Sequence, residues 1–75
     1  MNADEFNQLR LQLAGALKEA RLAAGFSQEA LALEAGVDRT YVSQLERGVA
    51  NPSLLVLHKL AAILNVELVI GLTHH

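Results

Sequence analysis

The sequence predicts an all-α fold, a compact domain of four to five helices. Apolar residues recur at steps of three and four along most of the chain, which is the spacing of one helix face. Isolated glycines and capping residues divide this pattern into short segments. Hydrophobic residues make up 52% of the chain and aromatic residues only 4%, so leucine, alanine and valine fill the core. The 75 residues are expected to form one domain, 1–75, near the smallest size that folds alone.

The first predicted helix runs from about Ala3 to Ala24. Gly25 follows it and supplies the left-handed conformation that commonly ends a helix. The apolar stripe of this helix consists of Phe6, Leu9, Leu13, Ala16, Leu17 and Ala20.

Two shorter helices are predicted within residues 27–48. Ser27 is expected to cap the first, which ends at Gly36. Asp38 is expected to cap the second, which runs to about Arg47 before Gly48 ends it. Counted from Gln28, the small fifth residue is Ala32, and the apolar fourth, eighth, tenth, fifteenth and eighteenth residues are Leu31, Ala35, Val37, Val42 and Leu45. This spacing predicts a helix-turn-helix motif, whose second helix enters the major groove of DNA.

The fourth predicted helix begins after a loop over residues 49–52, where Pro52 excludes helical geometry at the preceding residue. Ser53 is expected to cap it and Asn65 to end it. Its predicted buried face consists of Leu54, Leu57, Leu60, Ala61 and Leu64.

The C-terminal segment, about residues 65–73, is predicted to mediate dimerisation. Leu68, Ile70 and Leu72 alternate with other residues, and Gly71 disfavours a helix, so the pattern favours an extended strand. A single strand leaves its backbone unpaired, so it is expected to pair with the same strand of a second copy. A short fifth helix is the alternative.

From about Leu13 to Val66 the chain resembles the Cro/repressor (XRE) class of helix-turn-helix regulators. The run from Asp38 to Tyr41, together with Ser43, is also similar to restriction–modification controller proteins, and the apolar C-terminal segment is similar to that of helix-turn-helix antitoxins. The resemblance implies that the outward face of the second motif helix reads base edges. The implied base-contacting residues are Arg39, Thr40, Tyr41, Ser43 and Gln44.

The resemblance also implies phosphate contacts and one structural ion pair. The implied phosphate-contacting residues are Gln28, Arg47, Asn51 and Ser53. An arginine late in the first helix and a glutamate late in the third, Arg21 and Glu46, are expected to form an ion pair that holds the helices in register.

Charge and composition limit the function further. The net charge is −2, which counts against nucleic-acid binding, although helix N-termini and backbone amides can hold phosphates without basic side chains. The chain has no cysteine, and His58, His74 and His75 fit no metal-ligand spacing, so neither an enzyme nor a cofactor or metal site is expected. No apolar run reaches the length of a membrane span and the first residues are acidic, so neither a span nor a basic leader is expected, and a cytoplasmic, nucleoid-associated location is predicted.

Three functions fit these observations. The first is a homodimeric regulator, a repressor or autoregulator, that binds double-stranded DNA at a near-palindromic operator. The alternative is an antitoxin that binds a toxin protein and regulates its own operon. The third is a helix-turn-helix used only for contacts with other proteins.

Overall fold

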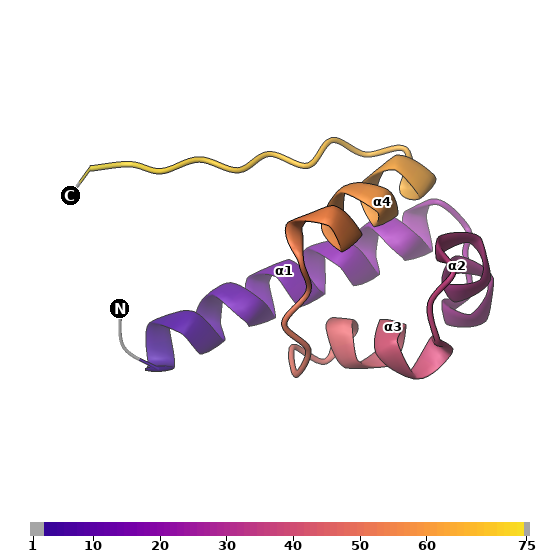
Figure 1. Cartoon of the computed structure of the whole chain (residues 1–75), viewed down its shortest axis with the longest axis horizontal. Helices are drawn as coiled ribbons and strands as arrows, with labels where there is room; N and C mark the ends of the chain where they lie inside the picture. The colour runs from indigo at the N-terminus through magenta and orange to yellow at the C-terminus, as the bar shows by residue number, and fades with distance from the viewer. Residues whose placement is uncertain (1–2, 75) are drawn as a thin grey trace.

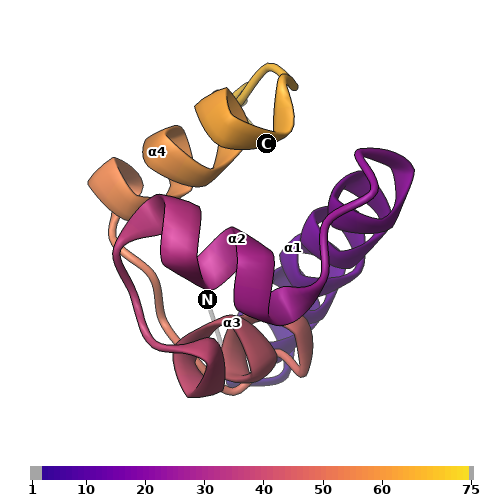
Figure 2. The same ribbon diagram turned by 90° about the vertical axis from the view of Figure 1, so that its right-hand side faces the viewer.

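The structure, a computed structural model, describes residues 3–74 as four helices with no strand in that range. They are α1 (Ala3–Ala23), α2 (Gln28–Ala35), α3 (Arg39–Glu46) and α4 (Leu54–Leu64). Helix α3 packs against α1 and α2, and α2 also packs against α4 (Figures 1 and 2). The all-α prediction is confirmed. None of the helices described is long and apolar enough to cross a membrane.

Most of the predicted helix ends are confirmed. Ser27 Oγ accepts a hydrogen bond of 3.0 Å from the Ala30 amide, and Gly36 ends α2 in the left-handed region with a φ of 70°. Ser53 caps α4 in the same way, and Asn65 ends it with a φ of 57°. A serine side chain and a left-handed residue therefore fix both ends of α2 and of α4.

The start of α3 differs from the prediction in one respect. Asp38 occupies the capping position with extended backbone, but its side chain makes no capping hydrogen bond. Its backbone carbonyl instead accepts bonds from the amides of Tyr41 and Val42 at 3.0 and 3.3 Å. Asp38 is therefore the N-cap residue, as predicted, but its side chain adds no hydrogen bond to the start of α3.

The core lies where α2, α3 and α4 meet. It is built from Leu31, Ala32, Ala35, Val42, Leu45, Leu60 and Leu64, with Leu17, Ala20, Phe26, Val37, Tyr41, Ala50, Val56 and Ile63 packed around it. Leu57 is only half-buried and Leu54 is 61% exposed, so the predicted buried face of α4 was wrong at these two residues. Both precede Leu60, the first fully buried residue of α4, and in this first part of the helix Val56 is the residue that packs against the core.

Helix α1 and the C-terminal segment project from the same side of this core. Residues 3–9 of α1 are all exposed, and its only buried residues are Ala14 and Arg21. After α4 the described chain contains no fifth helix, so that alternative was wrong. Instead, residues 66–74 are extended and run back along α1, toward its N-terminal end (Figure 1). Pairing of this segment with a second copy stays a prediction.

Candidate nucleic-acid interface

Helix α3 has one buried side and one polar side. Val42 and Leu45 are 1% and 4% exposed and hold one side of the helix in the core. Residues three and four positions apart lie on one face of a helix, so the opposite side forms a continuous polar stripe. This stripe consists of Thr40, Ser43, Gln44 and Arg47, with Arg39 beside it in the first turn.

The five predicted base-contacting residues differ in accessibility. Arg39 and Thr40 are exposed, whereas Tyr41, Ser43 and Gln44 are half-buried. Tyr41 also packs against the hydrophobic core, so its ring serves the fold as well as the surface. A long side chain with five hydrogen-bond donors at the exposed start of α3 makes Arg39 the residue best placed to reach a base edge.

A buried ion pair braces α3 against α1. Arg21 Nε donates to Glu46 Oε2 at 2.6 Å, and Arg21 Nη2 donates to Glu46 Oε1 at 3.0 Å. The side chains of Arg21 and Glu46 are only 8% and 4% exposed. The structure thus brings together the two residues that the sequence resemblance had paired, in the bidentate geometry that orients both groups.

Two further contacts extend this brace. Arg21 Nη1 donates to the carbonyl of Phe26 at 2.7 Å, and Gln28 Nε2 donates to Glu46 Oε1 at 3.1 Å. The network therefore joins the end of α1, the following loop, the start of α2 and the end of α3. It fixes the position of α3 relative to α2, which is the geometry that any groove-binding surface on this motif requires.

The ion pair also sets the charge state of Glu46. Burial acts to raise the pKa of this carboxyl group, but hydrogen bonds from Arg21 and Gln28, with the positive charges of Arg21 and Lys18, outweigh it. The pKa of Glu46 consequently lies below its ordinary value. The hydrogen bond to Glu46 raises the pKa of Arg21, and this outweighs the opposing effect of burial. Both groups are charged in the folded protein at neutral pH.

The predicted phosphate-contacting residues lie at two places beside α3. Gln28 is half-buried at the start of α2 and is linked to Glu46, so it is a positioning residue as well as a candidate phosphate ligand. Arg47, Asn51 and Ser53 are exposed along the segment that leaves α3. Ser53 Oγ accepts from the Val56 amide at 3.1 Å, so its hydroxyl proton is left to donate elsewhere.

Two structural contacts had no signal in the sequence. Lys59 Nζ donates to the Ala35 carbonyl at 3.3 Å and so satisfies the C-terminal end of α2. The Phe26 carbonyl completes the hydrogen bonding of Arg21. Both contacts join a side chain to a backbone group, and residue spacing carries no information about such pairs.

His75 lies outside the described residues, and residues 3–74 contain no group of three or more side chains arranged to hold a metal ion.

Comparison with known proteins places this arrangement in a family context. A helix-turn-helix family model (HTH_3) matches residues 17–70. Control protein C.BamHI of Bacillus amyloliquefaciens is 39% identical over 62 residues, which cover 81% of this chain and 76% of the relative. The chain spans only 30% and 55% of the length of two other curated relatives.

Solved structures show the same arrangement of helices. The restriction–modification controller protein C.AhdI from Aeromonas hydrophila superposes with a TM-score of 0.77 at 43% identity, covering 81% of this chain and 88% of that one. SinR, a master regulator for biofilm formation solved in complex with DNA, superposes with a TM-score of 0.69 at 38% identity. That match covers 73% of this chain and 89% of SinR in that structure.

Proposed function

This chain belongs to the helix-turn-helix family whose model matches residues 17–70, and we propose that it is a sequence-specific transcription regulator that binds double-stranded DNA. The observation that carries the proposal is the polar, accessible side of α3, held rigidly against α1 and α2 by the Arg21–Glu46 pair. The similarity to controller proteins and to a regulator solved with DNA supports it. The chain acts by binding alone, without catalysis or a cofactor.

In the proposed complex α3 lies in the major groove. Arg39 extends its guanidinium to guanine O6 and N7, the commonest base-specific contact, and Gln44 is placed one turn further along the helix. Thr40 contacts a thymine methyl group or a phosphate. These contacts specify sequence because each depends on the donor and acceptor pattern of one base pair.

Phosphate contacts on both sides of α3 position the domain. The amide of Gln28, the Ser53 hydroxyl, and the side chains of Arg47 and Asn51 supply hydrogen bonds that carry no sequence information. Since the whole chain has a net charge of −2, few charges are neutralised per subunit. The affinity of one subunit is therefore expected to be modest and to fall steeply with salt concentration.

We further infer a homodimer on a near-palindromic operator, acting as a repressor or autoregulator. Two copies related by a two-fold axis would present their α3 helices to successive major grooves about 34 Å apart. Occupation of a promoter by such a dimer blocks transcription without any further domain. None of the relatives reported above is described as an antitoxin, so a toxin partner is not part of this proposal.

The deciding experiment is selection of bound duplexes from a random library at moderate salt. The expected result is a near-palindrome whose half-sites are separated by about one helical turn. Failure to enrich any sequence, at low salt as well, would reject DNA binding and favour a motif used only for protein contacts.

Two substitutions of Arg39 separate base reading from charge. Arg39→Ala is expected to cost about 1–3 kcal/mol of binding free energy at one base position of the selected site. Arg39→Lys keeps the positive charge but loses the planar fork, so it should lose discrimination at that position and keep binding to unrelated DNA. Equal weakening of all sequences by both variants would show that Arg39 contacts only phosphate.

A further inference from the structure

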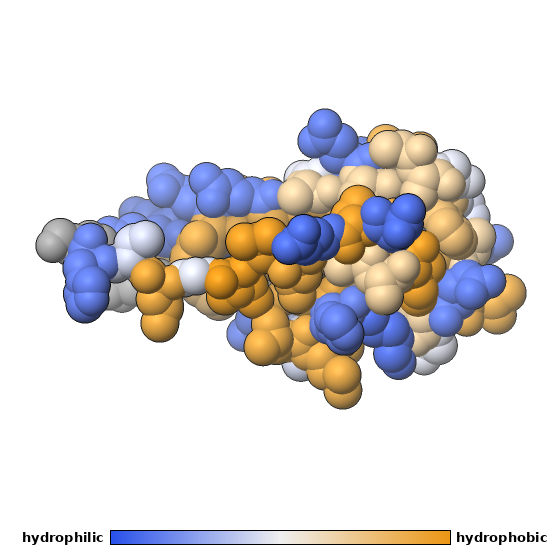
Figure 3. Space-filling view, turned by 90° about the horizontal axis from the view of Figure 1, so that it is seen from above, coloured by the Kyte–Doolittle hydropathy of each residue, from blue (hydrophilic) through white to orange (hydrophobic). Residues whose placement is uncertain are grey.

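The segment 66–74 and the first half of α1 form an apolar surface that nothing in the described chain covers. Val69, Ile70 and Leu72 are 79%, 62% and 101% exposed, and Phe6 and Leu9 of α1 are 37% and 50% exposed. Seen from above, apolar side chains follow the extended segment along the molecule (Figure 3). Glu67 is the only charged residue between Val66 and Thr73.

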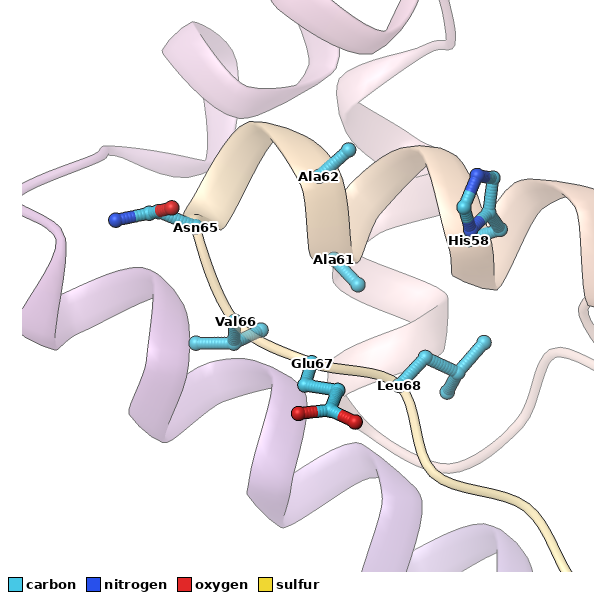
Figure 4. Close-up of a pocket in the computed structure, with 7 residues that line it drawn as sticks. All are labelled: His58, Ala61, Ala62, Asn65, Val66, Glu67 and Leu68. Carbon is cyan, nitrogen blue, oxygen red and sulfur yellow. The ribbon is translucent and has the colours of Figure 1, made fainter.

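A hollow connects this surface to the core. It has a volume of about 110 Å³ and lies between α1, α4 and the start of the segment. Leu13, Leu17, Leu57 and Leu68 are among its lining residues. A second, more open hollow lies beside His58 and Ala62 and shares Ala61, Val66, Glu67 and Leu68 with the first. Figure 4 shows Glu67 and Leu68 pointing to opposite sides of the chain, as two successive side chains of a strand do.

The exposed area of the chain is too large for a compact monomer. Its accessible surface is 5525 Å², whereas a folded monomer of 8.1 kDa exposes roughly 4,500 Å² by the usual scaling with mass. The excess of roughly 1,000 Å² is comparable to the roughly 800 Å² that each partner buries in a stable protein interface. A second copy of this chain would remove the excess from both molecules at once.

We propose that the segments 66–74 of two copies pair as an antiparallel two-stranded ribbon over the exposed half of α1. The inference deepens the homodimer of the proposed function and rests on it. Beyond the Val66 amide, which donates to the Ala61 carbonyl at 3.0 Å, no backbone hydrogen bond is formed by the described part of the segment. Pairing with its own copy satisfies these groups.

Backbone chemistry favours this partner over closure of the segment onto its own α1. The amides and carbonyls along a helix are already bonded to one another, so a single strand packed on α1 would bury its own polar groups unpaired. From Val66 to Leu72 an extended chain spans about 20 Å. The fourteen residue-to-residue steps of α1 from Phe6 to Ala20 span about 21 Å. The ribbon therefore has the length needed to cover the apolar stripe of α1.

The register follows from the requirement for full overlap. Residues 66–74 overlap completely when the two-fold axis passes Ile70, because this residue is their midpoint. Ile70 then lies opposite itself and Leu68 lies opposite Leu72 of the other copy. Glu67 lies opposite Thr73 rather than opposite the second Glu67, so no like charges meet.

Sedimentation of the full chain over a range of concentrations tests the interface. We expect a dimer, and we expect the double variant Ile70→Glu/Leu72→Glu to raise its dissociation constant at least about 100-fold. The double variant should show the ellipticity of the diluted, monomeric wild-type chain, because both replaced side chains are exposed and the helix-turn-helix stays folded. Leu33→Glu is the matched control, because Leu33 is an exposed leucine of α2 (83%) away from this surface, and it should remain dimeric. A monomeric wild-type chain at hundreds of micromolar, or a dimer that survives the double variant, would overturn the proposal.

Disulfide trapping tests the register, and the natural chain contributes no cysteine of its own. Under mild oxidation Ile70→Cys should form a covalent dimer much faster than Leu72→Cys or Leu33→Cys. Equal rates at all three positions would overturn the antiparallel pairing. The dimer interface and the DNA interface can fail separately. A chain that sediments as a dimer but binds no duplex would reject DNA binding and leave the dimer interface supported.

Discussion

Replacing the buried ion pair one residue at a time, and then as a pair, gives the strongest test of how α3 is held. Arg21→Met removes two hydrogen bonds to Glu46 and one to the Phe26 carbonyl while it keeps most of the side-chain volume. The Glu46 carboxylate is only 4% exposed, and Gln28 alone would then remain bonded to it. Leaving one buried charge without its partner costs about 3–5 kcal/mol.

That cost is a large share of the stability available. A domain of 75 residues has an unfolding free energy of roughly 4–11 kcal/mol. Its unfolding entropy is about 0.16 kcal/mol per degree, so a loss of 3 kcal/mol lowers the melting temperature by about 20 °C. Urea unfolding followed by circular dichroism at one fixed protein concentration measures the loss directly, and the fixed concentration removes the effect of dimer dissociation.

The double variant Arg21→Met/Glu46→Leu identifies the cause. Replacing both charges by apolar side chains leaves no unpaired charge in the core, so the double variant should recover at least about 2 kcal/mol relative to Arg21→Met. No recovery would refute the explanation by an uncompensated buried charge. A loss below about 1 kcal/mol for Arg21→Met would show instead that water screens the pair.

Three further predictions follow from the same structure. The free energy of unfolding should decline in acid, because the pKa of Glu46 is lowered in the folded protein. Its carboxylate stabilises the fold above the ordinary pKa of 4.5, and this contribution is lost as the pH falls through the folded-state pKa. In acid titrations of stability, Glu46→Gln should therefore show a shallower decline than the wild-type chain. Gly48→Ala should cost only slightly more than Gly25→Ala in urea unfolding. Both glycines have a positive φ, and at Gly48 the new Cβ would lie 2.8 Å from Leu11 Cδ2, which must turn aside but is the end of a 58% exposed side chain; a much larger loss for Gly48→Ala would show that Leu11 cannot move. Ser27→Ala should cost about 1 kcal/mol through loss of the α2 cap, and no change in thermal unfolding would show that water replaces it.

The helix-turn-helix was predictable because its signals are local. Ser27, Gly36, Ser53 and Asn65 act within one turn of a helix, so each could be assigned from its immediate neighbours. The ion pair joins residues 25 positions apart, and it was available only through resemblance to other members of the family. Spacing within one chain segment contains no information about such a contact.

Other features depend on where packing stops, which periodicity does not encode. Leu54 has the spacing of a buried residue, yet it precedes Leu60, the first fully buried residue of α4. Tyr41 occupies a surface position of the motif, yet its ring packs against the core. The extended C-terminal segment was indicated by alternation and by Gly71, but a strand partner on another molecule lies beyond what one chain can specify.

The uncovered first half of α1 makes helix content a measure of association. Residues 3–9 are all exposed, and the Arg10 guanidinium lies 5.0 Å from the centre of the Phe6 ring, a contact within about one turn of the helix. Such a helical extension frays readily in water, because tertiary packing supplies most of the stability of short helices. Dilution should therefore reduce the far-ultraviolet ellipticity of the N-terminal turns while the motif around Arg21 stays folded. Ordering of these turns would be coupled to the concentration of the protein itself.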